Sequence, residues 1–247
     1  SLWHLILSYN DLEDIPTNAL RYLQKLQSLD LTGNEISFIK PNSFRGLQNN
    51  LQTLIIADNS LNTVTGEAFQ GLPNLVTLDL SSNNLHEISP DVFREQMNSL
   101  TRVILADNLL SEIPYRQVSM LKALKLLDLS KNQITSMKIF HDDQPVDVKL
   151  SLQQLHLEHN QIYRLTTAAF QYFLSINQTF LDFNPIHQIS DDAFQQARIR
   201  ELYMRHCRLE IIEPSAFSGL ESTLQVLDMS GNNITALPDK LFNSFDL

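Results

Sequence analysis

The sequence is poor in cysteine and glycine. Among its 247 residues only Cys207 is a cysteine, and six residues are glycines. One cysteine allows no internal disulfide and supplies no second thiolate for a metal site. So few glycines leave no glycine-rich loop of the kind that holds phosphate groups. Motifs for acyl transfer and zinc hydrolysis, GxSxG and HExxH, are absent as well. We therefore expect a protein that is not an enzyme and that uses no cofactor and no metal.

Long apolar runs and positive charge are also scarce. No apolar run approaches the roughly 18 residues that are read as a membrane-spanning helix. The chain carries 18 Lys and Arg against 28 Asp and Glu, which gives a formal net charge of −10. Such a surface repels phosphate backbones and anionic membranes. We expect no nucleic-acid partner, and membrane attachment only through segments outside these residues.

What the sequence does contain is a repeat. The pattern LxxLxLxxNxL begins with Leu2, Leu5, Leu7, Asn10 and Leu12, and recurs at steps of 24, 25, 24, 25, 24, 28, 24, 23 and 25 residues. We call the residues at its Asn position the ladder residues. They are Asn10, Asn34, Asn59, Asn83, Asn108, Asn132, Asn160, Asn184, Cys207 and Asn232. A fixed period of this length is the signature of a solenoid.

Each repeat position has a physical role. Leu29 and Leu31 alternate with polar residues, which predicts a short strand whose leucines point inward, and such strands stack about 4.8 Å apart. An inward ladder amide can satisfy buried backbone groups. Cys207 is accordingly expected to be a buried structural thiol. Ten residues after the ladder position comes a large apolar residue. These residues are Leu20, Phe44, Phe69, Phe93, Val118, Phe170, Phe194, Phe217 and Phe242.

The repeat therefore predicts an α/β solenoid, a leucine-rich repeat horseshoe of about ten repeats. It would have short parallel strands on the concave face, irregular or 3-10 turns on the convex face, and no caps. Residues 1–247 are expected to form this single solenoid, as a fragment of a longer array. Two irregularities stand out: an acidic insertion near residues 141–149, and Thr179 where a leucine is expected.

Aspartates recur at one outward strand position, at Asp30, Asp79, Asp128 and Asp228. Paired carboxylates serve in acid and base catalysis. Here, however, the pattern interleaves isoleucines between the aspartates on an open face. We interpret the aspartates as solvated consensus positions.

Large outward side chains replace small ones in three successive turns. By register they form three rows: His156, Phe180 and Tyr203; Glu158, Asp182 and Arg205; His159, Phe183 and His206. Exposed aromatic residues and Arg on a rigid sheet are typical of a protein contact site. Chance enrichment, or packing against a glycan or loop, is the alternative. No sequence spacing demands a metal site at the histidines.

Two sequons are candidate glycosylation sites: Asn177 with Thr179, and Asn233 with Thr235. With so many asparagines, roughly two sequons arise by chance. They are compatible with secretion without establishing it.

The repeat length, the Phe positions and the phrase Phe44, Arg45, Gly46, Leu47 resemble the typical subtype of extracellular leucine-rich repeats, found in cell-surface receptors and adhesion proteins. The alternating steps of 24 and 25 residues and the phrase from Leu224 through Leu237 look most like an adhesion member of this family. That resemblance implies a glycoprotein made almost entirely of repeats and held on the outer leaflet by a lipid anchor.

The leading hypothesis is an extracellular protein-binding module that mediates cell adhesion. Its partner would be a protein ligand or a like molecule on an apposed cell, and its place the extracellular face of the plasma membrane. The first alternative is the ligand-binding ectodomain of a Toll-like or other innate-immune or developmental receptor. The second alternative is an intracellular scaffold or a regulator of an enzyme.

Overall fold

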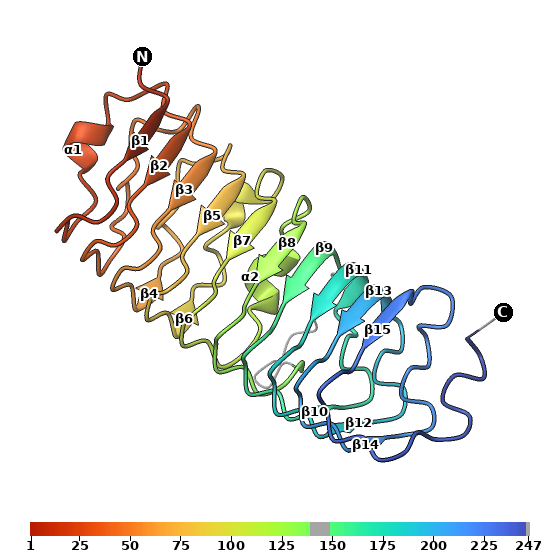
Figure 1. Cartoon of the computed structure of the whole chain (residues 1–247). Coiled ribbons are helices and arrows are strands. Elements are labelled where there is room, and N and C mark those ends of the chain that lie inside the picture. The colour runs from red at the N-terminus through yellow and green to blue at the C-terminus, as the bar shows by residue number, and fades with distance from the viewer. Residues whose placement is uncertain (139–148, 246–247) are drawn as a thin grey trace. The chain divides into compact units, whose positions relative to one another are not determined.

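The computed structural model describes residues 1–138 and 149–245, which form two compact units. The first unit comprises Ser1–Leu110 and Pro114–Leu127, and the second comprises Ser111–Ile113 and Asp128–Leu247. Both units are stacks of short parallel strands joined by irregular turns (Figure 1). The predicted solenoid fold is therefore confirmed. The predicted acidic insertion lies, apart from Lys149, outside the described residues.

One strand per turn lies side by side in chain order in the first unit (Figure 1). These strands are β1 (His4–Ile6), β2 (Ser28–Asp30), β3 (Thr53–Ile55), β5 (Thr77–Asp79) and β7 (Arg102–Ile104). Neighbouring strands pair in parallel, so that equivalent repeat positions face each other, as Leu29 faces Leu54. The central residues of β2, β3, β5 and β7 are buried. The repeat thus fixes the register, because a slip by one residue would turn the leucines to solvent.

The second unit has four further strands of this kind, and all but the last are longer. They are β9 (Leu150–His156), β11 (Phe173–Phe180), β13 (Arg198–Tyr203) and β15 (Val226–Asp228), again parallel and in chain order. Strand β8 (Leu126–Asp128) spans the division between the units. β11 has eight residues, whereas each of the five strands named for the first unit has three. The sequence pattern did not predict this lengthening.

The connecting segments contain little helix. In the first unit they hold α1 (Thr17–Leu20), the 3-10 helix η1 (Arg94–Gln96) and α2 (Tyr115–Ser119). Two-residue strands form further parallel ladders, which the sequence analysis did not anticipate. They are β4 (Thr63–Val64) with β6 (Glu87–Ile88), and β10 (Arg164–Leu165) with β12 (Gln188–Ile189) and β14 (Ile211–Ile212). Their second residues are buried apolar side chains, which holds the backbones close enough to pair.

The predicted large apolar residues stack through the core of each unit. In the first unit the ring centroids of Phe44 and Phe69, and of Phe69 and Phe93, are 6.4 Å apart. Leu20 and Val118 occupy the same position in their turns and are buried. In the second unit the stack runs through Phe170, Phe194, Phe217 and Phe242. Of these, Phe242 is 40% exposed.

The ladder amides connect adjacent turns. Asn83 donates from Nδ2 to the carbonyl oxygens of Ile56 (2.9 Å) and Leu80 (3.1 Å), and its Oδ1 accepts from the backbone N–H of Leu61 (3.0 Å). Asn34, Asn59, Asn108, Asn160 and Asn184 make bonds of the same kind. Asn10 is exposed, and its amide bonds only within its own turn. Asn232 is partly buried and reaches Met204 and Cys207.

Candidate functional site

The predicted contact residues come together on three neighbouring turns of the second unit. Phe180, at the end of β11, pairs with His156 of β9 on one side and with Tyr203 of β13 on the other. Backbone bonds continue this register beyond the strands, from His159 N–H to the Asp182 carbonyl (3.0 Å) and from Phe183 N–H to the Arg205 carbonyl (2.9 Å). We call this surface the aromatic patch. It comprises His156, Glu158, His159, Phe180, Asp182, Phe183, Tyr203, Arg205 and His206.

Two rows of the aromatic patch are stacks of parallel rings. The centroid of Phe180 lies 4.5 Å from that of His156 and 5.0 Å from that of Tyr203. Phe183 lies 4.6 Å from His159 and 5.1 Å from His206. These distances follow the spacing of parallel strands, so the sheet itself imposes the stacking. Because the ring faces cover one another, the ring edges are the parts that a partner can contact. Phe183 is 50% exposed.

The row that contains Phe183 has the left-handed backbone that the repeat adopts at this position. His159, Phe183 and His206 have φ angles of 56°, 58° and 55°. These residues precede the ladder position, where the other turns also have a positive φ, at Tyr9, Gly33, Asp58, Ser82, Asp107, Lys131 and Gly231. For a bulky residue a positive φ is an outlier, and it costs about 1–3 kcal/mol. An exposed phenylalanine at such a position is not explained by the needs of the fold.

The middle row is built around an ion pair. Asp182 accepts from Nε (3.1 Å) and Nη2 (2.6 Å) of Arg205, and also from the Arg205 backbone N–H (2.6 Å). This hydrogen bonding and the negative charge raise the pKa of Arg205, which therefore stays charged. Its guanidinium carbon lies 5.5 Å from the ring centroid of Tyr203. Arg205 is thus held in place while its side chain remains 43% exposed.

Asp182 differs from the sequence-based prediction. Its register places it on the strand face, but it is only 3% exposed, because Arg205 covers it. A residue so buried offers no surface to a partner. We therefore assign Asp182 the role of orienting Arg205, a role that register alone does not distinguish from direct contact with a partner.

His156 has its own carboxylate partner. Its Nδ1 lies 2.9 Å from Oε1 of Glu158. Burial lowers the pKa of His156, but the hydrogen bond and charge of Glu158, together with the charge of Asp128, outweigh this and leave the pKa raised. Glu158 is thus engaged within the patch through Oε1, while its Oε2 is buried without a hydrogen-bond partner.

A polar row beside the aromatic patch was missed by the sequence analysis. Gln154 donates to Gln178 (2.9 Å), which donates to Glu201 (2.8 Å), and the Tyr203 hydroxyl also donates to Glu201 (3.0 Å). The bonds from Gln178 and Tyr203 lower the pKa of Glu201, and the Glu201 bond raises that of Tyr203. The strand register could have predicted this row, because its residues stand two positions before His156, Phe180 and Tyr203 and so share their face of the sheet.

The recurring aspartates have a local structural role. Oδ1 of Asp79 accepts from both the hydroxyl (2.6 Å) and the backbone N–H (2.9 Å) of Ser81. Asp30 bonds Thr32 in the same way, and Asp128 bonds Ser130. The solvation expected at these positions is incomplete, because Asp30, Asp79 and Asp128 are only partly exposed. They stabilise the chain where it leaves each strand.

Across residues 1–138 and 149–245, no group of three or more His, Cys, Asp or Glu residues is placed to hold a metal ion. His156 and His159 belong to different ring stacks. Over the same residues, no helix has the length and apolar character needed to cross a membrane.

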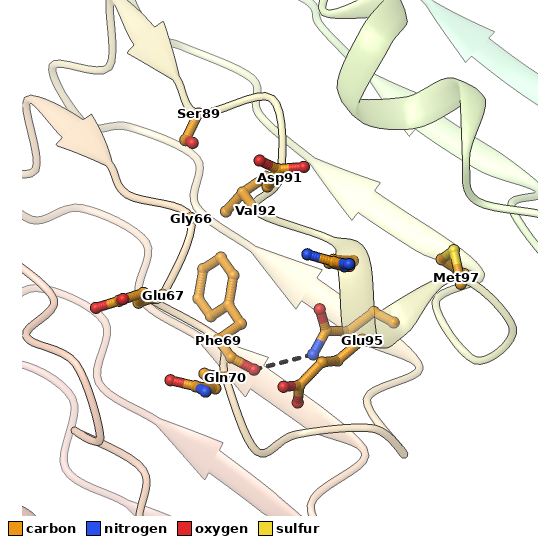
Figure 2. A pocket seen from close by; sticks show the side chains of 11 residues that line it. Gly66, Glu67, Phe69, Gln70, Ser89, Asp91, Val92, Glu95 and Met97 are labelled. Carbon is orange, nitrogen blue, oxygen red and sulfur yellow. Dashed lines mark hydrogen bonds between the residues drawn. The ribbon is translucent and has the colours of Figure 1, made fainter.

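A hollow of about 640 Å³ lies beside η1 in the first unit (Figure 2). Its lining includes the carboxylates of Glu67, Asp91 and Glu95. The buried Gln96 donates to the carbonyl oxygens of Phe69 (2.9 Å) and Leu72 (3.0 Å), and Glu95 accepts from the N–H of Gly71 (2.6 Å). These groups hold adjacent turns together, so we assign the hollow a structural origin.

Cys207 takes the place of a ladder amide. It is fully buried, its Sγ lies 3.2 Å from the Leu181 carbonyl oxygen, and burial raises the pKa of its thiol to about 11. We expect no reaction with Ellman's reagent at pH 8 in the folded chain, and one equivalent after unfolding in guanidinium chloride. Rapid stoichiometric labelling of the folded chain would show instead that Cys207 is an accessible, reactive thiol.

The fold and the repeat positions define a class of protein. The family model for the leucine-rich repeat matches residues 1–49, 49–96 and 180–234, more than half of the chain, which therefore belongs to the leucine-rich repeat family. Among curated proteins, chaoptin of Drosophila melanogaster is 52% identical over 99 residues, which are 40% of this chain and 8% of chaoptin. These matches confirm the resemblance to an adhesion member of the family that the repeat pattern predicted, and that member is chaoptin.

Solved structures share the fold along nearly the whole chain. An LRR chain from a complex of latrophilin 3, Unc5D and FLRT2 matches 98% of this chain and 72% of its own length, with a TM-score of 0.76 and 22% identity. The TLR13 complex with ssRNA13 matches 98% of this chain and 38% of that chain (TM-score 0.73, 23% identity). The APL1 leucine-rich repeat domain matches 94% of this chain and 63% of that chain (TM-score 0.65, 26% identity).

Proposed function

We propose that the chain is a non-enzymatic, extracellular protein-binding module that mediates cell adhesion through the aromatic patch. The observation that carries this proposal is the exposed row of His159, Phe183 and His206, which the fold does not require. Leucine-rich repeat solenoids bind through extended strand surfaces. The similarity to chaoptin favours adhesion over the capture of a soluble ligand.

The patch has the composition of an interaction hot spot. Aromatic residues and Arg contribute most to protein interfaces, especially when they are rigid before binding. Phe180 and Phe183 are each packed between two rings, and Arg205 is fixed by Asp182. A partner would therefore lose little side-chain entropy on this side of the contact.

The partner class follows from charge and resemblance. A net charge of −10 disfavours nucleic acid, which leaves a protein ligand or a like molecule on an apposed cell. We place the chain on the extracellular face of the plasma membrane, attached through segments other than those described. The chain matches only 8% of chaoptin, so this location is part of the proposal.

The double variant Phe183→Ser, Tyr203→Ser should weaken adhesion at least about tenfold, because each anchor commonly contributes about 2 kcal/mol or more. The chain would be coupled to beads of two colours. Aggregation of the beads and their binding to cells of the tissue that expresses the protein would be measured by flow cytometry. Aggregation indicates contacts between like molecules, whereas binding to cells alone indicates a different protein partner.

The matched control is Tyr163→Ser, which removes another exposed aromatic side chain of the second unit. Circular dichroism would first establish that both variants are folded. The control should bind as the wild type does. Unchanged binding by the double variant would move the contact away from the patch, and absence of any wild-type binding would overturn the proposed function.

A further inference from the structure

Thr179 is an anomaly in the core of the second unit. It pairs with Leu155 of β9 and Leu202 of β13, and is the only polar residue at the central strand position of the repeat. It is 0% exposed, and its Oγ1 has no hydrogen-bond partner. A buried hydroxyl without a partner destabilises a fold, and leucine serves this position in adjacent turns. Packing therefore does not explain why threonine stands here.

The threonine does complete an acceptor sequence. Asn177, Gln178 and Thr179 form the sequon N-x-T, in which the hydroxyl of the third residue is required. Asn177 is exposed although it lies within β11. Ile176 and Gln178 are paired with residues of both neighbouring strands, whereas Asn177 between them is paired with neither strand. Its amide is therefore available outside the sheet.

The surroundings of Asn177 suit a ligand rich in hydroxyl groups. A hollow of about 350 Å³ is lined by Gln153, Gln154, Asn177, Gln178, Arg200 and Glu201. Amide, guanidinium and carboxylate groups provide both donors and acceptors for sugar hydroxyls. By contrast, the second sequon ends in Thr235, which is exposed. A threonine there costs the fold nothing, so its presence does not discriminate between use and chance.

We infer that Asn177 carries an N-linked oligosaccharide, and that Thr179 is retained in the core because the acceptor sequence requires it. In this transfer the Asn177 side-chain nitrogen forms a bond to the anomeric carbon of an oligosaccharide donated by a lipid diphosphate. The bond from that carbon to the diphosphate breaks, the diphosphate leaves with the electron pair, and the amide loses a proton. The modification precedes folding, while the hydroxyl is still accessible. It rests on the extracellular location proposed above.

The test separates the acceptor role of Thr179 from its packing role. The chain would be secreted from eukaryotic cells, and the peptide containing Asn177 analysed by mass spectrometry with and without enzymatic deglycosylation. We expect a glycan on the wild type and on Thr179→Ser, and none on Thr179→Val or Asn177→Gln. In chain made in bacteria, Thr179→Val should shift the urea midpoint upward and Thr179→Ser downward, since valine removes only the unpaired hydroxyl whereas serine removes a packed methyl group.

An unmodified Asn177 in the secreted wild type would overturn the inference. A lower urea midpoint for Thr179→Val would also overturn it, because the fold itself would then need the hydroxyl. Adhesion is tested separately, with the Phe183→Ser, Tyr203→Ser double variant. If Asn177 is unmodified but the wild-type chain still mediates adhesion, the glycan inference is wrong and the proposed function stands.

Discussion

Gly46→Ala should destabilise the first unit by about 3 kcal/mol or more, and lower its urea midpoint accordingly. Gly46 has a φ of 101°, which side-chain-bearing residues rarely adopt. A Cβ at this position would lie 2.2 Å from the carbonyl oxygen of Arg21 and 2.4 Å from its Cα. These atoms belong to the backbone of the preceding turn, so relief requires the two turns to move apart.

Gly66→Ala is the matched control, since Gly66 lies in the same unit without a positive φ. Its added Cβ would meet the rotatable hydroxyl of Ser89 at 3.3 Å. We expect a change within about 0.5 kcal/mol, as for other surface substitutions. Urea unfolding of both variants would be monitored by circular dichroism. Equal urea midpoints would contradict the close packing of Gly46 against Arg21.

Asn83→Ala should cost about 2–6 kcal/mol, because it leaves the Leu61 N–H and the Ile56 carbonyl buried without their partner. Leaving a buried donor or acceptor unsatisfied costs about 1–3 kcal/mol for each group. The variant would be compared with the wild type by urea unfolding followed by circular dichroism. Asn83→Cys should lose less, because the Cys207 thiol already bonds a carbonyl of the preceding turn.

The control for this pair is Asn84→Ala at the next residue, whose side chain is exposed. We expect a change within about 0.5 kcal/mol. If Asn83→Ala and Asn84→Ala unfold at the same urea concentration, the ladder amides do not hold the turns together, and the physical account of the repeat is wrong.

The sequence predicted the solenoid because its positions are constrained in two independent ways. Leucines such as Leu29 and Leu54 set the strand register, and Phe44 with Phe69 sets the opposite side of the core. Both patterns repeat with one period, so no other arrangement buries both. The short ladders of β4 with β6 and of β10, β12 and β14 could not be predicted, because two-residue strands have no periodicity of their own.

The rows of the aromatic patch followed from register alone, since alternation fixes which side chains share a face. What register cannot supply is which side chains within a row bond to one another. The ion pair of Arg205 with Asp182 on the neighbouring turn depends on side-chain rotamers, as does the polar row of Gln154, Gln178 and Glu201. The positive φ of Phe183 had a signal that was overlooked: glycine stands at the same position in two other turns.

Site-directed photocrosslinking tests the central claim most directly. Phe183 would be replaced with the photoreactive amino acid p-benzoylphenylalanine, which keeps an aromatic ring at this position, and Tyr163 would be replaced in a second chain. Each chain would be bound to the cells or beads that bind the wild type, and then irradiated. We expect a crosslink to a protein partner from position 183, suppressed by excess wild-type chain, and none from position 163. Undiminished binding with no crosslink from position 183 would contradict the claim.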